Sequence, residues 1–196
     1  MNYLAHAYLS FNQPDILVGN MISDFIKGKK QYDYPIPIQK GIQLHRAIDA
    51  FTDNHSAVRE AKLYLKPAVG LYSGAFIDIV FDHYLAKDTI IFTEINQLAS
   101  FAAQTYQSLE TYEALFPDNF KKMFPYMKQN NWLYNYQFAW GIEKSFANIA
   151  RRATYLTSSG ECFKLWEENY DAIHQLYKAF FPDLKLYVLE SLDTLG

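Results

Sequence analysis

Histidines and aspartates recur together in the first 83 residues, at spacings that suit a metal site. Four of the five histidines in this chain of 196 residues lie close in sequence to an aspartate. Most of these polar side chains fall in apolar, helix-like stretches, where an unpaired charge is costly to bury or shifts its pKa until it is neutral. A divalent metal shared by several side chains would remove that cost. The pattern therefore indicates an enzyme rather than a plain helical bundle.

The pair His45 and Asp49 is the clearest candidate for metal ligation. The two residues are one helical turn apart, so their side chains project from one face of a helix. Oxygen-rich ligation with one or two imidazoles suits Mn²⁺, Mg²⁺ or Fe²⁺. Cys162 is the single cysteine, which argues against a structural zinc site.

The same four-residue spacing recurs in Asn20 with Asp24 and in Asp78 with Asp82. We expect each pair to lie on its own helix and to share one helical face. Adjacent helical residues diverge by about 100°, so Asp82 and His83 cannot both face one site. We favour Asp82 as the residue that faces the metal, with His83 reaching the site from its flank.

Structural explanations exist for several of these residues. Asp49 could form an ion pair with Arg46 or Arg59, and His6 could cap a helix or satisfy the core. For Asp53, a cap on the following helix is the favoured interpretation. A functional role is favoured for the set Asp24, His45, Asp49 and Asp82. Each of the four would otherwise need a separate structural explanation.

Composition predicts a globular cytoplasmic protein. Half of the residues are hydrophobic, and 16 Tyr and 15 Phe easily supply a packed core. The formal net charge of −3 gives no sign of nucleic-acid or membrane binding. A lone cysteine fits a reducing compartment, and the first residues lack the basic segment of a signal peptide. The apolar stretch 68–81 contains Asp78 and is too short to span a bilayer.

Hydrophobic periodicity predicts an all-α fold. No strict alternation with hairpin turns appears, and glycines and prolines fall where helices should start and stop. No repeat or flexible linker divides the chain, so we expect a single compact multi-helix domain over residues 1–196. The expected helices span residues 16–26, 38–51, 76–85, 93–115, 137–156 and 161–181.

Several linked segments follow one another in a characteristic order and spacing, and these are residues 1–6, 19–25, 41–49, 52–54, 58–61 and 82–85. Together they resemble the acyl carrier protein phosphodiesterase family, and residues 150–152 stand at the place of a basic motif of that family. This family resembles the HD-type metal-dependent phosphohydrolases, so the resemblance implies an HD-like helical fold. It also implies an enzyme that hydrolyses the phosphodiester between 4′-phosphopantetheine and a serine of holo-acyl carrier protein, with Mn²⁺ as the associated metal.

The resemblance and the spacings together imply roles for individual residues. Metal ligation is expected for Asp24, His45, Asp49 and Asp82. His83 or His6 would be a fifth ligand or the proton donor to the leaving serine oxygen. Water activated by the metal would attack phosphorus, while Arg46 offsets the developing charge.

Acyl carrier proteins are strongly acidic, so docking should use basic side chains. The candidates are Arg59, Lys62, Arg151 and Arg152, which could equally form a solvated face. No oligomeric state is predicted.

Two alternative functions stay open. The same metal centre could act on a small phosphoester, such as a nucleotide. The chain could instead be a non-enzymatic helical module that binds an apolar ligand or partner through its aromatic residues, particularly in residues 126–140. That aromatic region is more simply explained as core packing.

Overall fold

The computed structural model describes residues 1–195, and all the regular secondary structure in them is helical. The all-α prediction is therefore confirmed. The α-helices are α1 (Tyr3–Tyr8), α2 (Pro14–Ile22), α3 (Ile36–Asn54), α4 (Ser56–Val69), α5 (Ser73–Ala86), α6 (Gln97–Glu110), α7 (Asp118–Gln129), α8 (Trp132–Asn135), α9 (Ala139–Arg152), α10 (Gly160–Glu168) and α11 (Tyr170–Leu195). Short 3₁₀ helices are η1 (Ser23–Phe25), η2 (Gly28–Asp33), η3 (Gly70–Tyr72) and η4 (Glu113–Leu115).

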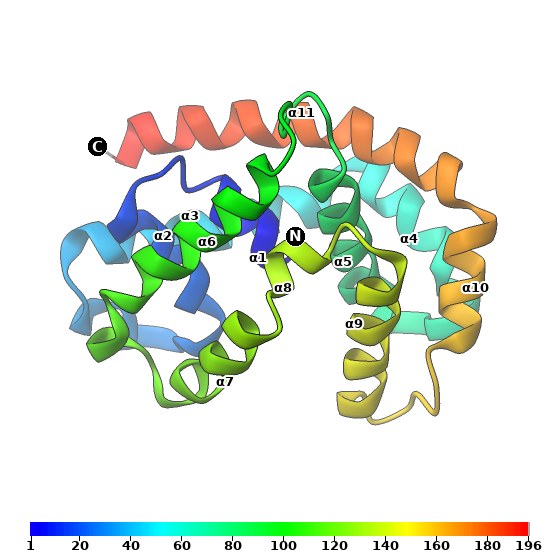
Figure 1. Cartoon of the computed structure of the whole chain (residues 1–196), viewed down its shortest axis with the longest axis horizontal. Helices are drawn as coiled ribbons and strands as arrows, with labels where there is room; N and C mark the ends of the chain where they lie inside the picture. The colour runs from blue at the N-terminus through cyan, green and yellow to red at the C-terminus, as the bar shows by residue number, and fades with distance from the viewer. Residues whose placement is uncertain (196) are drawn as a thin grey trace.

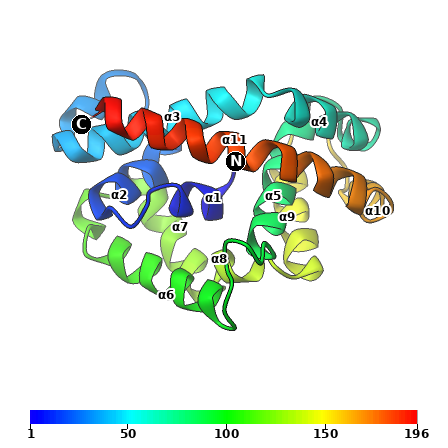
Figure 2. The ribbon, with the colours of Figure 1, turned by 90° about the horizontal axis from the view of Figure 1, so that it is seen from above.

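The long helix α11 spans the molecule and packs against α3, α4 and α5 (Figures 1 and 2). The short helix α1 lies near the middle of both views, in contact with α2 and α5. The buried hydrophobic side chains form one core cluster that runs from Met1 to Val188. The fold therefore places α1, α2, α3 and α5 around one central region.

Proline and 3₁₀ geometry set the ends of α2 and α3. Pro14 occupies the first turn of α2, where its missing N–H costs nothing. The predicted helix over residues 16–26 ends earlier, at Ile22, because the chain tightens there into η1. Asp24 thus lies on a 3₁₀ turn rather than on the predicted α-helical face. The predicted helix over residues 38–51 is present as the longer α3.

Helices α2 and α3 cross in direct backbone contact at two glycines. A Cβ atom added to Gly19 would lie 2.1 Å from the Ile38 carbonyl oxygen, and one on Gly41 would lie 2.4 Å from that of Ile16. No other residue type fits either position without separating the helices. The crossing brings the end of α2, with Asn20, against the face of α3 that carries His45.

One stretch, residues 56–86, is long and apolar enough by length and composition to cross a membrane. The structure divides this stretch at Gly70, whose φ of +54° ends α4, and α5 then packs against α4. Asp82 and His83 are buried inside it. Buried polar groups with protein partners are the property of a core helix rather than of a lipid-facing one.

Candidate metal centre

His45 and Asp49 on α3 meet Asp24 from η1. The Nε2 atom of His45 lies 3.0 Å from Asp24 Oδ1 and 3.1 Å from Asp49 Oδ2. His45 is buried, whereas the Asp24 side chain is 64% exposed and that of Asp49 is 43% exposed. The predicted i, i+4 pair is therefore present, and the group is open to solvent on its carboxylate side.

Backbone hydrogen bonding fixes which nitrogen of His45 faces the carboxylates as a potential ligand. Its Nδ1 lies 2.7 Å from the backbone oxygen of Asn20. A carbonyl oxygen only accepts, so Nδ1 carries the proton and donates it there. The Nε2 atom of the neutral ring therefore presents a lone pair to Asp24 and Asp49. Imidazole ligands in metal sites are commonly oriented in this way, through the second nitrogen.

His6 has the same orientation, set by the side chain of Asn20. The amide nitrogen of Asn20 donates to the His6 carbonyl oxygen at 2.9 Å and to Ser10 Oγ at 3.1 Å. Its amide oxygen is therefore left to accept from His6 Nδ1, at 2.7 Å. The Nε2 lone pair of His6 then faces Asp49 Oδ1 at 3.3 Å. The rings of His6 and His45 stack with centroids 4.0 Å apart.

This arrangement fits a divalent cation better than it fits the bare protein. His6 Nε2 is buried without a hydrogen-bond partner among the described residues. A lone pair opposite a carboxylate oxygen needs either a proton or a positive ion between them. Single ligand atoms of His6, His45 and Asp49 all lie within 4.8 Å of one another. The residues present therefore form a possible His/Asp metal-binding group.

The pKa values of the metal-free group follow from burial and from these contacts. Burial disfavours the His45 imidazolium, but hydrogen bonds to Asp24 and Asp49 outweigh it and raise its pKa to about 9. Burial and the positive charge on His45 lower the pKa of His6 to about 4. Burial would raise the pKa of Asp49, yet its hydrogen bond with His45, its close contact with His6 and the positive charge of the Met1 amine hold it far below its usual value. One proton on His45 thus stands where a metal could bind.

The α-ammonium group of Met1 adds a fixed positive charge beside the histidines and aspartates. Its nitrogen lies 3.1 Å from Asp78 Oδ1 and 3.7 Å from Asp49 Oδ1. Burial lowers the pKa of this amine, but the charges of Asp78 and Asp49 outweigh burial and raise it. Asp78 is therefore an ion-pair partner of the Met1 amine.

Asp82 lies outside this group and holds the start of α1. Its carboxylate accepts hydrogen bonds from the backbone N–H groups of Asn2, Leu4 and Ala5, at 3.3, 2.7 and 3.3 Å. Both oxygens are used in this way, and the residue is fully buried. We therefore replace its expected role as a metal ligand by a structural one, because its lone pairs serve the first turn of α1.

His83 also points away from the group. Its Nδ1 donates to the Tyr136 carbonyl oxygen at 2.7 Å, and its Nε2 lies 3.0 Å from the Tyr170 hydroxyl. Burial lowers its pKa to about 4, so the ring is neutral and joins α5 to the α8–α9 connection and to α11. The expected role as fifth ligand or proton donor has no geometric basis there.

The basic side chains named from the sequence have varied surroundings. Arg46 is exposed and donates to Gln31 Oε1 at 2.7 Å and to the Ile26 carbonyl at 3.3 Å. Lys62 forms an ion pair with Asp53 at 2.8 Å. The predicted capping role of Asp53 is wrong, because the side chain of His55 caps α4. Arg59 is exposed on α4, and Arg151 and Arg152 are exposed at the end of α9.

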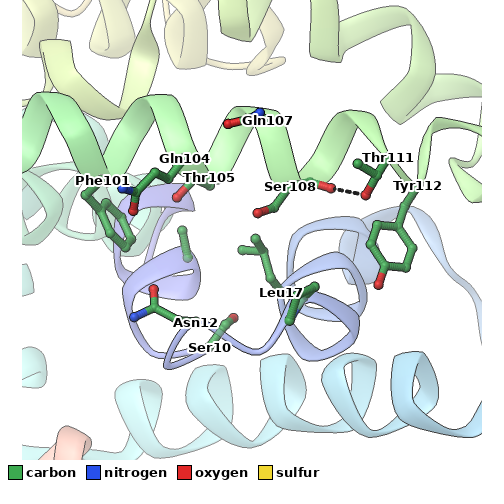
Figure 3. Close-up of a pocket in the computed structure, with 12 residues that line it drawn as sticks. Ser10, Asn12, Leu17, Phe101, Gln104, Thr105, Gln107, Ser108, Thr111 and Tyr112 are labelled. Atoms are coloured by element: carbon green, nitrogen blue, oxygen red, sulfur yellow. Dashed lines mark hydrogen bonds between the residues drawn. The ribbon is translucent and has the colours of Figure 1, made fainter.

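A separate cavity of about 550 Å³ lies between α6 and the α1–α2 segment. Figure 3 shows Gln104, Thr105 and Ser108 of α6 on one side, with Ser10 and other residues of the α1–α2 segment on the other. Its lining in the described part of the chain includes no charged side chain and no member of the metal-binding group. The cavity touches the centre only indirectly, through the hydrogen bond of Ser10 to Asn20. The cavity and the histidine–aspartate group are therefore separate features of the structure.

Comparison with known proteins agrees with the resemblance found in the sequence. Residues 1–184 match the family model of acyl carrier protein phosphodiesterase. The chain belongs to that family. A family member from Klebsiella pneumoniae (strain 342) is 28% identical over 184 residues, covering 94% of this chain and 95% of the relative. The relative from Yersinia pestis is also 28% identical over 184 residues, with the same two coverages. A Photorhabdus laumondii relative is 26% identical over 194 residues, or 99% and 96% of the two chains. No solved structure matches the chain.

Sequence reasoning about this family member missed two parts of the centre. Asn20 was recognised only as one half of a repeated spacing, yet it orients both histidines, through its side chain and its backbone oxygen. The second part is the α-ammonium group of Met1, which lies 3.1 Å from Asp78 and 3.7 Å from Asp49. The adjacent Gly19 was the available signal for Asn20, because a glycine that permits helix contact places its neighbour in the interface.

Proposed function

We propose that this protein is a metal-dependent hydrolase that removes 4′-phosphopantetheine from holo-acyl carrier protein, giving the apo-protein. Membership of the acyl carrier protein phosphodiesterase family supports the substrate and the reaction. The paired Nε2 atoms of His6 and His45, both directed at Asp49, are the observation that supports a metal. A cytoplasmic location and an HD-like fold, as expected from the sequence, belong to the same proposal.

The proposed ligands are Asp24, His45, Asp49 and His6. Mn²⁺ suits this set best, with Mg²⁺ or Fe²⁺ as alternatives, because the set combines imidazoles with hard carboxylate oxygens. A divalent ion held there supplies a Lewis acid and lowers the pKa of a water ligand, as phosphodiester hydrolysis requires. His6 is assigned to ligation rather than to proton donation, because its protonated Nδ1 is committed to Asn20.

Basic side chains near the open face offset the charge of the phosphodiester in this proposal. Arg46 directly follows His45, and within residues 1–195 its guanidinium donates to the neutral oxygens of Gln31 and Ile26. Arg152 lies close enough to Tyr3 to affect the pKa of its hydroxyl, as Asp24 does from the metal centre. Burial is the main cause of the raised pKa of Tyr3, so the hydroxyl stays protonated, and it donates its hydrogen bond to Met123 Sδ at 3.6 Å.

Docking of the acidic carrier protein was predicted to use Arg59, Lys62, Arg151 and Arg152. Arg152 is supported by its electrostatic effect on Tyr3, beside the centre, and Arg151 by its adjacent place at the end of α9. Lys62 already has a carboxylate partner in Asp53, so it contributes less free charge. We keep Arg151 and Arg152 as the preferred candidates of this set.

The proposal is tested by incubating metal-stripped protein with holo-acyl carrier protein, with and without Mn²⁺, and measuring intact masses. A mass loss of about 340 Da from the carrier protein, only when metal is added, is expected for hydrolysis at the phosphodiester. A panel of nucleotides treated in parallel distinguishes this substrate from small phosphoesters. Nucleotide cleavage with an unchanged carrier protein would contradict the proposed substrate. Failure to bind or respond to Mn²⁺ would contradict the metal and favour a binding module.

A further inference from the structure

Three lysines with no carboxylate partner lie in the segment that follows η1. Lys27, Lys29 and Lys30 are exposed, and no ion pair within residues 1–195 includes any of them. Residues 27–34 contain one acidic residue, Asp33. Because the whole chain has a net charge of −3, this local excess of positive charge is not a consequence of composition. We call Lys27, Lys29 and Lys30 the lysine segment.

The lysine segment is held in place from α3. Arg46 donates to Gln31 Oε1 at 2.7 Å and to the Ile26 carbonyl oxygen at 3.3 Å, so it binds the segment on both sides of the lysines. Gln39 donates to the Tyr34 carbonyl oxygen at 2.7 Å and fixes the far end. Both acceptors of Arg46 are neutral, so its own charge adds to that of the lysines. A backbone fixed in this way loses little conformational entropy when a partner binds.

The lysine segment also borders the metal centre. Lys27 follows Asp24 by three residues, so their Cα atoms are at most about 11 Å apart. Asp24 contacts His45, and Arg46 is the next residue of α3. A partner that docks on the lysines is therefore positioned beside the carboxylate side of the centre, which is open to solvent.

We propose that the lysine segment is a docking surface for the acidic face of the carrier protein, an inference that rests on the proposed function. Three unpaired ammonium groups and a guanidinium complement a cluster of carboxylates, and such complementarity accelerates encounter and fixes orientation. The segment would act together with Arg151 and Arg152 and would bring the phosphodiester to the ligands. Of the residues predicted for docking, Lys62 has its charge offset by a neighbouring carboxylate, that of Asp53.

The test reverses the charge of the lysine segment and measures binding separately from catalysis. The variant K27E/K29E/K30E and the wild-type protein are titrated with fluorescently labelled apo-acyl carrier protein, which carries no scissile group. Affinity is expected to fall by about tenfold or more, and the dependence of Kd on salt should flatten. Hydrolysis of a small chromogenic phosphodiester should stay unchanged, because no metal ligand is altered.

The matched control is K66E/K164E/K178E, which makes the same change in net charge at exposed lysines of α4, α10 and α11. It should bind the carrier protein like the wild-type protein. Equal affinity of K27E/K29E/K30E and wild type, or an equal loss in the control, would overturn the docking proposal. So would preferential binding of single-stranded RNA over the carrier protein. Lysine-dependent binding without release of the prosthetic group would support docking and refute the proposed function instead.

Discussion

The imidazole rings of His6 and His45 stack at 4.0 Å and both direct Nε2 toward the carboxylate of Asp49. The two residues come from different helices, α1 and α3, and are oriented by one residue of a third helix, Asn20 of α2. Three helices are thus required to hold this pair of nitrogens. Their shared orientation is what makes the group suitable for a metal rather than only for an ion pair.

Asn20 should control metal affinity without touching the metal. The substitution Asn20→Ala removes the acceptor of the His6 proton, so the ring can rotate or change tautomer. Weakening of Mn²⁺ binding by about 10- to 100-fold is expected, as for other residues that orient metal ligands. Calorimetric titration of metal-stripped protein measures it. Asn54→Ala on α3 is the control, because Asn54 is exposed and bonds only to its own helix. Equal affinity in both variants would contradict the role of Asn20.

Asp82 should be needed for stability rather than for metal content. Asp82→Asn weakens the acceptor of three backbone N–H groups at the start of α1, and the free energy of unfolding should fall by about 1–3 kcal/mol. At saturating Mn²⁺ the variant should still bind as much metal per chain as the wild-type protein. Urea denaturation and metal analysis measure the two quantities. A folded variant that binds less metal at saturation would restore Asp82 as a ligand.

The metal-free protein should lose stability as the pH rises from 7 to 9. The pKa of His45 is about 9 in the folded chain and about 6.5 when unfolded. The stabilisation that this proton provides is therefore fully present below the pKa of the unfolded chain. It is lost as the pH rises to the pKa of the folded chain. The decline should be on the order of 2 kcal/mol, since Asp24 is largely exposed to solvent.

Saturating Mn²⁺ should abolish most of that decline, because the metal replaces the proton on His45. In the variant His45→Gln, the loss of stability should begin only above pH 8.0. This remaining loss arises from the raised pKa of the Met1 amine. Urea denaturation at several pH values measures these free energies. A flat profile in the metal-free wild-type protein would show that His45 does not hold this proton.

The crossing of α2 and α3 should tolerate no side chain. Gly41→Ala places a methyl group 2.4 Å from the Ile16 carbonyl oxygen, so the helices must separate. Loss of about 3 kcal/mol of stability and weaker Mn²⁺ binding are expected, because Asn20 and His45 move apart. Gly160→Ala is a suitable control, since no atom lies within 4 Å of the added carbon. Thermal denaturation of the two variants should differ clearly.

Helical periodicity was sufficient to predict the all-α fold and the i, i+4 pair on α3, because both depend on local spacing. It was insufficient for Asp82, since the same apolar surroundings suit a metal ligand and an acceptor for buried N–H groups. The position of Asp24 on a 3₁₀ turn depends on how α2 ends against α3. The helix predicted over residues 137–156 ends earlier, because α9 ends at Arg152. The helix predicted over residues 161–181 is divided in two, because α10 ends at Glu168 and α11 begins at Tyr170.

The role of Asn20 could not be inferred from spacing, because its partners lie 14 and 25 residues away. Such contacts follow from the glycine-mediated helix crossing rather than from any one helix. The lysine segment could not be predicted from spacing for a related reason. Whether a lysine has a carboxylate neighbour, as Lys62 has in Asp53, is decided by the tertiary fold.

The most direct test of the metal-dependent function compares the wild-type protein with Asp49→Asn, a substitution that preserves shape and removes charge. Both are loaded with Mn²⁺, analysed for bound metal and incubated with holo-acyl carrier protein, whose intact mass is then measured. Asp53→Asn, on the same helix but exposed, is the control. The account predicts that Asp49→Asn stays folded, loses metal and leaves the carrier protein intact, while wild type and control release the prosthetic group. A folded Asp49→Asn protein that keeps its metal and its activity would contradict the account.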